Sequence, residues 1–170
     1  MTKDEMKKVV CQAIDKAAEK IHETVLRIES EPELGYKETK TSAKVESYMK
    51  ELGLTPQTGL ALTGVKTCVD GGKKGPAVAV LAELDAVGTP DSPKADPLTG
   101  AAHTCGHFLQ MASMLAACTG IVKSGVMQDL AGSAVFFAVP AEEYVEIDYR
   151  KRLVKEGKIH FLGGKSELVY

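Results

Sequence analysis

Apolar side chains near the start of the chain recur at spacings of three and four, which predicts an amphipathic helix. These positions are Val10, Ile14, Ala17, Ile21, Val25 and Ile28. Thr2 and Glu5 have the spacing of a capping box, so we expect the helix to begin there. Pro32 and Gly35 would end it, and a second helical pattern covers residues 39–52.

The pattern then changes to that of strands. Residues 60–69 are rich in β-branched side chains and end at a glycine-rich turn signal, so they predict one strand. Residues 77–82 form a continuous apolar run, as expected for a strand buried on both faces. These two strands could form a hairpin or lie in neighbouring positions of one sheet. Residues 133–139 predict a further buried strand.

Two more helices complete the pattern. Residues 109–122 are apolar on most sides and predict a well-buried helix, and residues 147–156 predict a helix closed by Gly157. The order helix, helix, strand, strand, helix, strand, helix is typical of an α/β sheet. Residues 163–170 begin a further element and stop within it, so we expect a fragment. The alternative is a complete small domain with a short tail.

Composition narrows the class of protein. The chain has 170 residues, of which 44% are hydrophobic and 26% charged, as in a globular domain. The net charge of -2 excludes the basic footprint of a nucleic-acid-binding protein. No apolar run approaches the roughly 18 residues of a membrane span, and the N-terminus lacks the apolar core of a signal peptide. We therefore expect a cytoplasmic protein that binds neither nucleic acid nor a membrane.

The four cysteines are not expected to form disulfides, because the chain carries no secretion signal. Cys11 and Cys118 fall in helical patterns and Cys68 in a strand pattern, so each is predicted to be a buried free thiol. Cys105 differs from these three because it stands between two histidines, His103 and His107.

Candidate metal ligands therefore occur just before the helix at residues 109–122. Cysteine and histidine are ligands that suit zinc and related divalent ions. Cys105 and His107 are two positions apart, so in an extended loop their side chains project together. Gly106 between them permits an unusual backbone angle. Two alternatives remain open, a chance clustering at a helix start and a Cys–His nucleophile pair.

Carboxylates follow two of the predicted strands. Glu83 and Asp85 come directly after residues 77–82 and could face one site. Glu142 and Glu143 follow residues 133–139, and adjacent side chains point in different directions. One carboxylate could then bind a metal while the other acts as a base, although solvated carboxylates at strand ends explain each pair taken alone.

Taken together, three segments resemble the amidohydrolase branch of the aminoacylase and carboxypeptidase metallopeptidases. This branch includes hippurate hydrolases and enzymes that cleave N-acyl amino acids. The segments are Ala82-Glu83-Leu84-Asp85-Ala86-Val87, Gly100-Ala101-Ala102-His103-Thr104-Cys105-Gly106-His107 and Phe137-Ala138-Val139-Pro140-Ala141-Glu142-Glu143. Residues 31–35, with Glu38 and Thr41, are similar to the family's N-terminal segment. The resemblance implies a zinc-exopeptidase-like, three-layer α/β/α fold with a mostly parallel or mixed central sheet.

The resemblance also implies a site with two divalent metal ions, zinc or manganese. The implied metal ligands are Cys105, His107 and Glu143. Glu142 matches the general base that activates water for attack on an amide carbonyl, and Asp85 matches a residue that orients a ligand. Glu83 matches an acidic position to which we assign no role. The implied substrates are N-acyl amino acids or small peptides.

Two departures from the family pattern limit the prediction. Many relatives carry Asp and His soon after Cys-Gly-His, whereas this chain has Phe108-Leu109-Gln110. The family's further histidine ligands and its lid domain, usually the dimerisation surface, come later, and His160 is too early to match. We therefore expect residues 1–170 to be the N-terminal part of a catalytic domain, incomplete and inactive alone. A non-catalytic binding or assembly module, or a thiol hydrolase using Cys105, remain alternatives.

Overall fold

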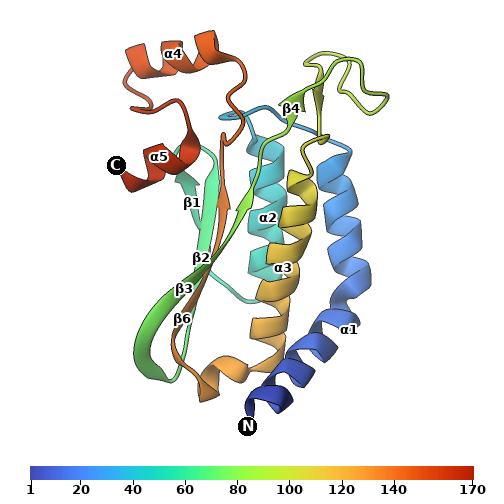
Figure 1. The fold of residues 1–170 in the computed structure, drawn as a ribbon, viewed down its shortest axis with the longest axis vertical. Helices are drawn as coiled ribbons and strands as arrows, with labels where there is room; N and C mark the ends of the chain where they lie inside the picture. The colour runs from blue at the N-terminus through green and yellow to red at the C-terminus, as the bar shows by residue number, and fades with distance from the viewer.

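A computed structural model describes all 170 residues, arranged as Figure 1 shows. The helices are α1 (Lys3–Glu29), α2 (Thr39–Glu51), α3 (His107–Ser124), the 3₁₀ helix η1 (Val126–Asp129), α4 (Ile147–Lys155) and α5 (Gly164–Val169). The strands are β1 (Gln57–Leu60), β2 (Gly64–Asp70), β3 (Lys73–Glu83), β4 (Val87–Gly88), β5 (Ala101–Ala102) and β6 (Ala131–Val139). No helix combines the length and the apolar character that crossing a membrane requires.

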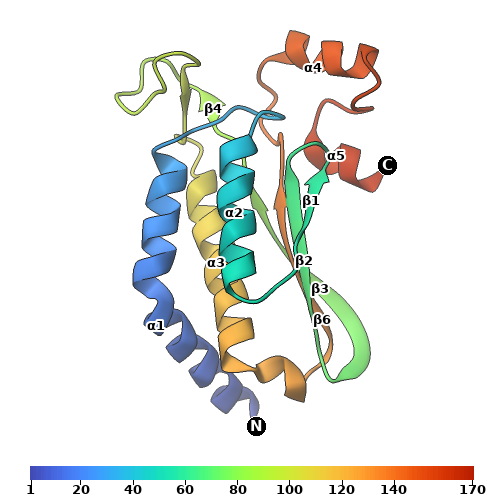
Figure 2. The same ribbon diagram turned by 180° about the vertical axis from the view of Figure 1, so that it is seen from behind.

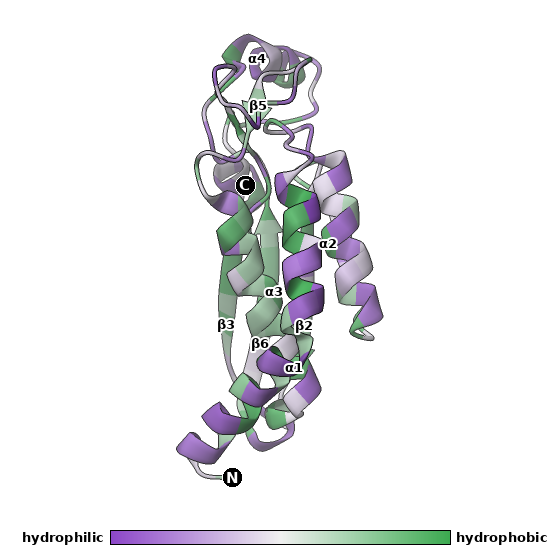
Figure 3. Cartoon of the chain, turned by 90° about the vertical axis from the view of Figure 1, so that its right-hand side faces the viewer, coloured by the Kyte–Doolittle hydropathy of each residue, from purple (hydrophilic) through white to green (hydrophobic).

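The four predicted helices are confirmed as α1 to α4. At the start of α1 the Thr2 hydroxyl accepts a hydrogen bond from the Glu5 backbone N–H, and the Glu5 carboxylate accepts one from the Thr2 N–H. The capping box therefore begins the helix as the sequence predicts. Ile21, Val25 and Ile28 of the apolar stripe are buried. Figure 3 shows α1 with alternating hydrophobic and hydrophilic positions on the helix side of the molecule.

The main sheet has the strand order β1-β2-β6-β3. β6 is antiparallel to β2 and parallel to β3, and α3 lies on the connection from β3 to β6. The strand predicted at residues 60–69 is present as β2, but its predicted start is wrong, because Ala61 and Leu62 adopt positive φ angles of 45° and 76° and separate β1 from β2. The expectation that β2 and β3 pair or neighbour each other is also wrong, since β6 lies between them.

β3 is an edge strand and is not buried on both faces as the sequence predicts. It pairs only with β6, and its Val78 and Leu81 side chains are 62% and 52% exposed. A continuous apolar run predicts a strand of a sheet that is covered on both sides. Among the described residues the helices cover one face only, which is why the apolar run of β3 stays exposed.

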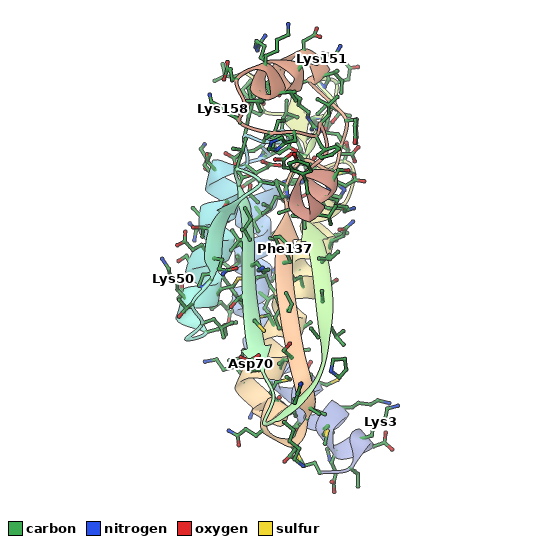
Figure 4. The ribbon with its side chains drawn as sticks, turned by 90° about the vertical axis from the view of Figure 1, so that its left-hand side faces the viewer. Lys3, Lys50, Asp70, Phe137, Lys151 and Lys158 are labelled. Atoms are coloured by element: carbon green, nitrogen blue, oxygen red, sulfur yellow. The ribbon has the colours of Figure 1, made fainter.

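Helices α1, α2 and α3 form one layer against the sheet, side by side in Figure 2. The core lies between this layer and the strands and includes Ile28, Val45, Met49, Val65, Met111, Leu115 and Phe136. Figure 4 views the opposite, uncovered face of the sheet, where Phe137 lies with the Lys66 ammonium 5.8 Å above its ring. The α/β class with a mixed central sheet is confirmed, and the helical layer that these residues supply lies on one side.

All four cysteines are free, as predicted, but only one of the three expected in the core is fully buried there. Cys118 of α3 is buried, whereas Cys11 and Cys68 are exposed, so the prediction of burial is wrong for these two. Cys11 lies outside the apolar stripe of α1. Cys68 alternates along β2 with Thr67 and Val69, which lie on the helix-covered side, and its thiol therefore faces solvent.

Candidate metal centre

The candidate site lies at the edge of the sheet where β3 and β6 end. The two strands are parallel and in register, with Glu83 opposite Val139, so the segments that follow them emerge side by side. Helix α3 begins at the same edge with His107, and α4 and α5 lie beyond it (Figure 1). Ligands in open α/β sheets bind outside the carboxyl ends of strands, which is where these residues meet.

The turn before α3 fixes the imidazole of His107. Gly106 has a φ of 90°, in the left-handed region that the sequence predicts glycine to supply here. The Nδ1 atom of His107 lies 2.9 Å from the backbone carbonyl oxygen of Asp85. A carbonyl oxygen only accepts, so Nδ1 carries a proton and donates a hydrogen bond to it, which leaves Nε2 as the unprotonated nitrogen whenever the ring is neutral. The Nε2 atom is then free to bind a ligand.

Three carboxylates surround this Nε2 atom. The nearest oxygens are those of Glu83 at 2.8 Å, Glu142 at 3.7 Å and Glu143 at 3.8 Å. The potential ligand atoms of Cys105, His107 and Glu143 all lie within 4.8 Å of one another, and so do those of Glu83, His107 and Glu142. The structure thus brings together the three ligands predicted from the sequence, and both carboxylates of the Glu142–Glu143 pair approach the same imidazole.

Asp85 lies beneath this cluster and is fully buried. Its Oδ2 atom accepts a 2.8 Å hydrogen bond from the backbone N–H of Glu143. Its Oδ1 atom has no hydrogen-bond partner and lies 3.4 Å from the Nδ1 atom of His107. Asp85 therefore touches both segments that carry predicted ligands, which is the place that an orienting residue requires.

His107 is the main positive charge inside the cluster. Burial alone would lower its pKa, but hydrogen bonds to Asp85 and Cys105 raise the pKa of the imidazole to about 11. Burial has the opposite effect on a carboxyl group, and it raises the pKa of Glu143. One thiol, one imidazole and several carboxylates at this edge of the sheet are a donor set that fits a divalent metal ion, whose charge would replace that of the imidazolium proton.

His103, the other histidine of the motif, stays outside both groups of ligands. It is buried, neither ring nitrogen has a hydrogen-bond partner, and its ring centroid lies 5.9 Å from that of Phe108. Burial lowers the pKa of His103 to about 4, so the ring is neutral at physiological pH. It lies beside Phe108 as an uncharged side chain.

Sequence reasoning missed Lys165 and Arg150 at the site and assigned no role to Glu83 and Glu38. Glu83, left without a role, lies nearest to the Nε2 atom of His107. Lys165 of α5 pairs with Glu83 and lies 3.9 Å from the Glu142 carboxylate. Glu38 and Arg150 hydrogen-bond the backbone of the turn that carries Glu142. Glu83 and Glu38 each had a signal in the sequence, Glu83 directly after a predicted strand and Glu38 in the N-terminal segment that resembles the family.

The candidate donor set therefore lies at the carboxyl edge of a mixed α/β sheet. No family model matches the chain. It is 31% identical over 82% of its length to YhaA of Bacillus subtilis, which carries the name of an amidohydrolase, and 31% identical over 77% to thermostable carboxypeptidase 2 of Saccharolobus solfataricus. It is also 30% identical over 66% to an N-acetylcysteine deacetylase of Bacillus subtilis. These matches cover 35%, 34% and 30% of the relatives, so the chain spans about a third of their length.

Solved structures show the same fold. The Bacillus subtilis YXEP protein, described as a dinuclear metal binding peptidase from the M20 family, superimposes with a TM-score of 0.64 at 24% identity. The match covers 81% of this chain and 39% of that protein. The chain is thus similar over most of its length to relatives named as an amidohydrolase, a carboxypeptidase and a deacetylase, and it shares the fold of a protein described as an M20 peptidase. The resemblance stated from the sequence is thereby confirmed.

Proposed function

We propose that the protein is a metal-dependent amidohydrolase that cleaves the amide bond of N-acyl amino acids or small peptides. The observation that carries the proposal is the gathering of the Cys105, His107 and Glu143 ligand atoms within 4.8 Å of one another. The relatives support the substrate class, since their names describe an amidohydrolase, a carboxypeptidase and a deacetylase. The matched segments make up about a third of these relatives, so the activity proposed is that of a whole protein of their kind.

Zinc or manganese is the proposed cofactor. A thiolate and an imidazole beside carboxylates suit zinc, and a protein of the same fold is described as dinuclear, which supports two ions in the complete site. Cys105, His107 and Glu143 would hold the metal. We also propose a cytoplasmic location, which the four free cysteines favour because thiols stay reduced there.

Each residue of the cluster then has a distinct task. A bound divalent ion supplies a Lewis acid that polarises the amide carbonyl. Glu142, with 37% of its side chain exposed, is accessible to substrate and acts as the general base that takes a proton from water and returns it to the leaving amine. Glu143 is tied to Asp85 through its backbone N–H and binds the metal. Asp85 fixes the tautomer of His107 through its carbonyl oxygen.

Zinc titration by calorimetry tests the proposal. We expect the chain to bind zinc, and Cys105→Ala to weaken binding at least about tenfold because a ligand is lost. Cys68→Ala is the matched control, since it removes an exposed thiol from β2 and should leave the affinity unchanged. Equal zinc affinity for both variants would contradict the metal site. N-acetylcysteine is the substrate to assay beside binding, and we expect little hydrolysis by these 170 residues.

A thiol hydrolase is the second candidate, because Cys105 and His107 lie close enough to act as a nucleophile and base. The two chemistries respond differently to chelators. A metal-dependent enzyme loses activity in EDTA and regains it with zinc, whereas a thiol hydrolase keeps its activity. Any turnover that survives EDTA would favour the thiol mechanism over our proposal.

A further inference from the structure

The turn that carries Glu142 and Glu143 has an unfavourable backbone conformation. Ala141 adopts a φ of 52°, in the left-handed region that residues with a Cβ atom disfavour. Such a conformation persists only where the surrounding structure holds it. Two buried ionisable side chains, Glu38 and Arg150, make contacts that do so here.

Glu38, the residue directly before α2, holds one end of the turn. It is fully buried. One of its carboxyl oxygens accepts a 2.7 Å hydrogen bond from the backbone N–H of Ala141, and the other accepts a 2.7 Å hydrogen bond from the Thr63 hydroxyl. A buried carboxyl group is costly unless it is hydrogen-bonded, and in this structure one of the compensating bonds goes to the turn.

Arg150 of α4 holds the turn from the other side and is also fully buried. Its Nη1 atom donates to the carbonyl oxygens of Ala141 at 3.3 Å and Leu162 at 2.7 Å, and its Nη2 atom donates to the carbonyl oxygen of Glu143. Gly35 provides the room for this guanidinium group, because a Cβ atom there would lie 2.2 Å from Nη2.

Together these contacts secure four consecutive peptide groups. Glu38 binds the N–H of the peptide between Pro140 and Ala141, and Arg150 binds the carbonyl of the next. Asp85 binds the N–H of the peptide that joins Glu142 to Glu143, and Arg150 binds the carbonyl that follows. The backbone on both sides of Glu142 is therefore fixed by side chains that are themselves buried.

We propose that Glu38 and Arg150 are positioning residues that set the direction of the Glu142 and Glu143 carboxylates for a divalent cation. The inference rests on the proposed function, since it concerns the same site. Neither side chain touches the cluster of ligand atoms, so both act through the backbone of the turn. Preorganisation of this kind by surrounding hydrogen bonds is what gives a metal site its affinity and geometry.

Zinc affinity, measured by calorimetry alongside the unfolding free energy, separates positioning from plain stability. Glu38→Leu removes the acceptor and should weaken zinc binding roughly tenfold or more, the usual effect of losing a supporting hydrogen bond at a metal site. Glu38→Gln keeps an acceptor for the Ala141 N–H and should retain the affinity within about twofold. Thr119→Val removes the buried hydrogen bond between Thr119 and Tyr48, far along α3, and should destabilise the chain without changing zinc affinity.

A Glu38→Leu chain that is destabilised like Thr119→Val but binds zinc as the wild type does would overturn the inference and leave the proposed function standing. Failure of the wild-type chain itself to bind zinc would overturn both. If Glu38→Leu does not fold, Arg150→Lys provides the same comparison. It keeps the charge but loses the planar fork that binds the carbonyls of Ala141, Leu162 and Glu143, so weaker zinc binding supports the inference and unchanged binding refutes it.

Discussion

The ammonium group of Lys165, at the start of α5, forms an ion pair with the carboxylate of Glu83, which lies 82 positions earlier at the end of β3. The same ammonium lies 3.9 Å from Glu142. Since Glu83 and Glu142 belong to one group of candidate ligands with His107, a lysine side chain occupies part of the coordination space that a metal would use.

Lys165→Met should therefore raise the affinity for zinc, because a competing cation leaves the site. We expect a gain of roughly two- to fivefold, as a half-exposed ion pair of up to about 1 kcal/mol allows. Lys158→Met is the control, since it removes the same charge from an exposed lysine that pairs with Glu156. An equal gain in both variants would trace the effect to net charge, and calorimetric titration distinguishes the outcomes.

Asp85→Ala should lower zinc affinity by about tenfold or more, because the Glu143 backbone loses its 2.8 Å hydrogen bond to the carboxylate. Asp85→Asn retains an oxygen acceptor and should have a smaller effect. Asp70→Ala is the matched control, an exposed carboxylate at the other end of the sheet in Figure 4, and should bind zinc as the wild type does. A normal zinc affinity for Asp85→Ala would remove Asp85 from the site.

The stability of the folded chain should depend on pH through Glu38. Burial, with a contribution from the nearby Asp85 charge, raises the pKa of Glu38 from 4.5 to about 7. Between these values the folded chain keeps the proton that the unfolded chain has lost, so the free energy of unfolding falls as pH rises. The stabilisation is complete below pH 4.5 and lost above about pH 7, and it amounts to about 3 kcal/mol at most.

Urea denaturation of the wild type and Glu38→Gln across this pH range measures the effect, because glutamine does not titrate. The difference in unfolding free energy between the two chains should change through the window and stay constant outside it. Glu23→Gln, which alters an exposed carboxyl group of α1, should follow the wild type at every pH. Parallel curves for the wild type and Glu38→Gln would show that the carboxyl is ionised in both states.

The local parts of the site could be predicted from the sequence because their signals are local. Residues 83–85 and 142–143 follow apolar strand runs, and residues 105–107 precede a helical pattern, so each can be placed at an element end. These three segments meet at one edge because β3 and β6 pair in parallel. The hydrophobic pattern of the sequence does not determine this pairing. The family resemblance, not the hydrophobic pattern, supplied this long-range information.

The supporting contacts could not be predicted, because they join residues far apart in the chain. Glu38 binds the backbone of a residue 103 positions away, and a single glutamate before a helix carries no sign of its partner. Lys165 lies in a six-residue helix with no apolar period to orient it. The exposure of β3 could not be predicted for the same reason. An apolar run shows that a strand can be buried, but it does not identify the element that covers the strand.

Gly35→Ala tests how closely the turn and its clamp are packed. A Cβ atom at this position would lie 2.2 Å from the Nη2 atom of Arg150 and 2.8 Å from the Cα atom of Ala141, so the guanidinium and the turn must shift apart. Overpacking of this kind costs about 1–3 kcal/mol, and we expect thermal denaturation to show that loss together with weaker zinc binding. Gly88→Ala is the control, because a Cβ atom there meets nothing within 4 Å. A Gly35→Ala chain with unchanged melting temperature and zinc affinity would mean that Arg150 can leave the turn without consequence for the site.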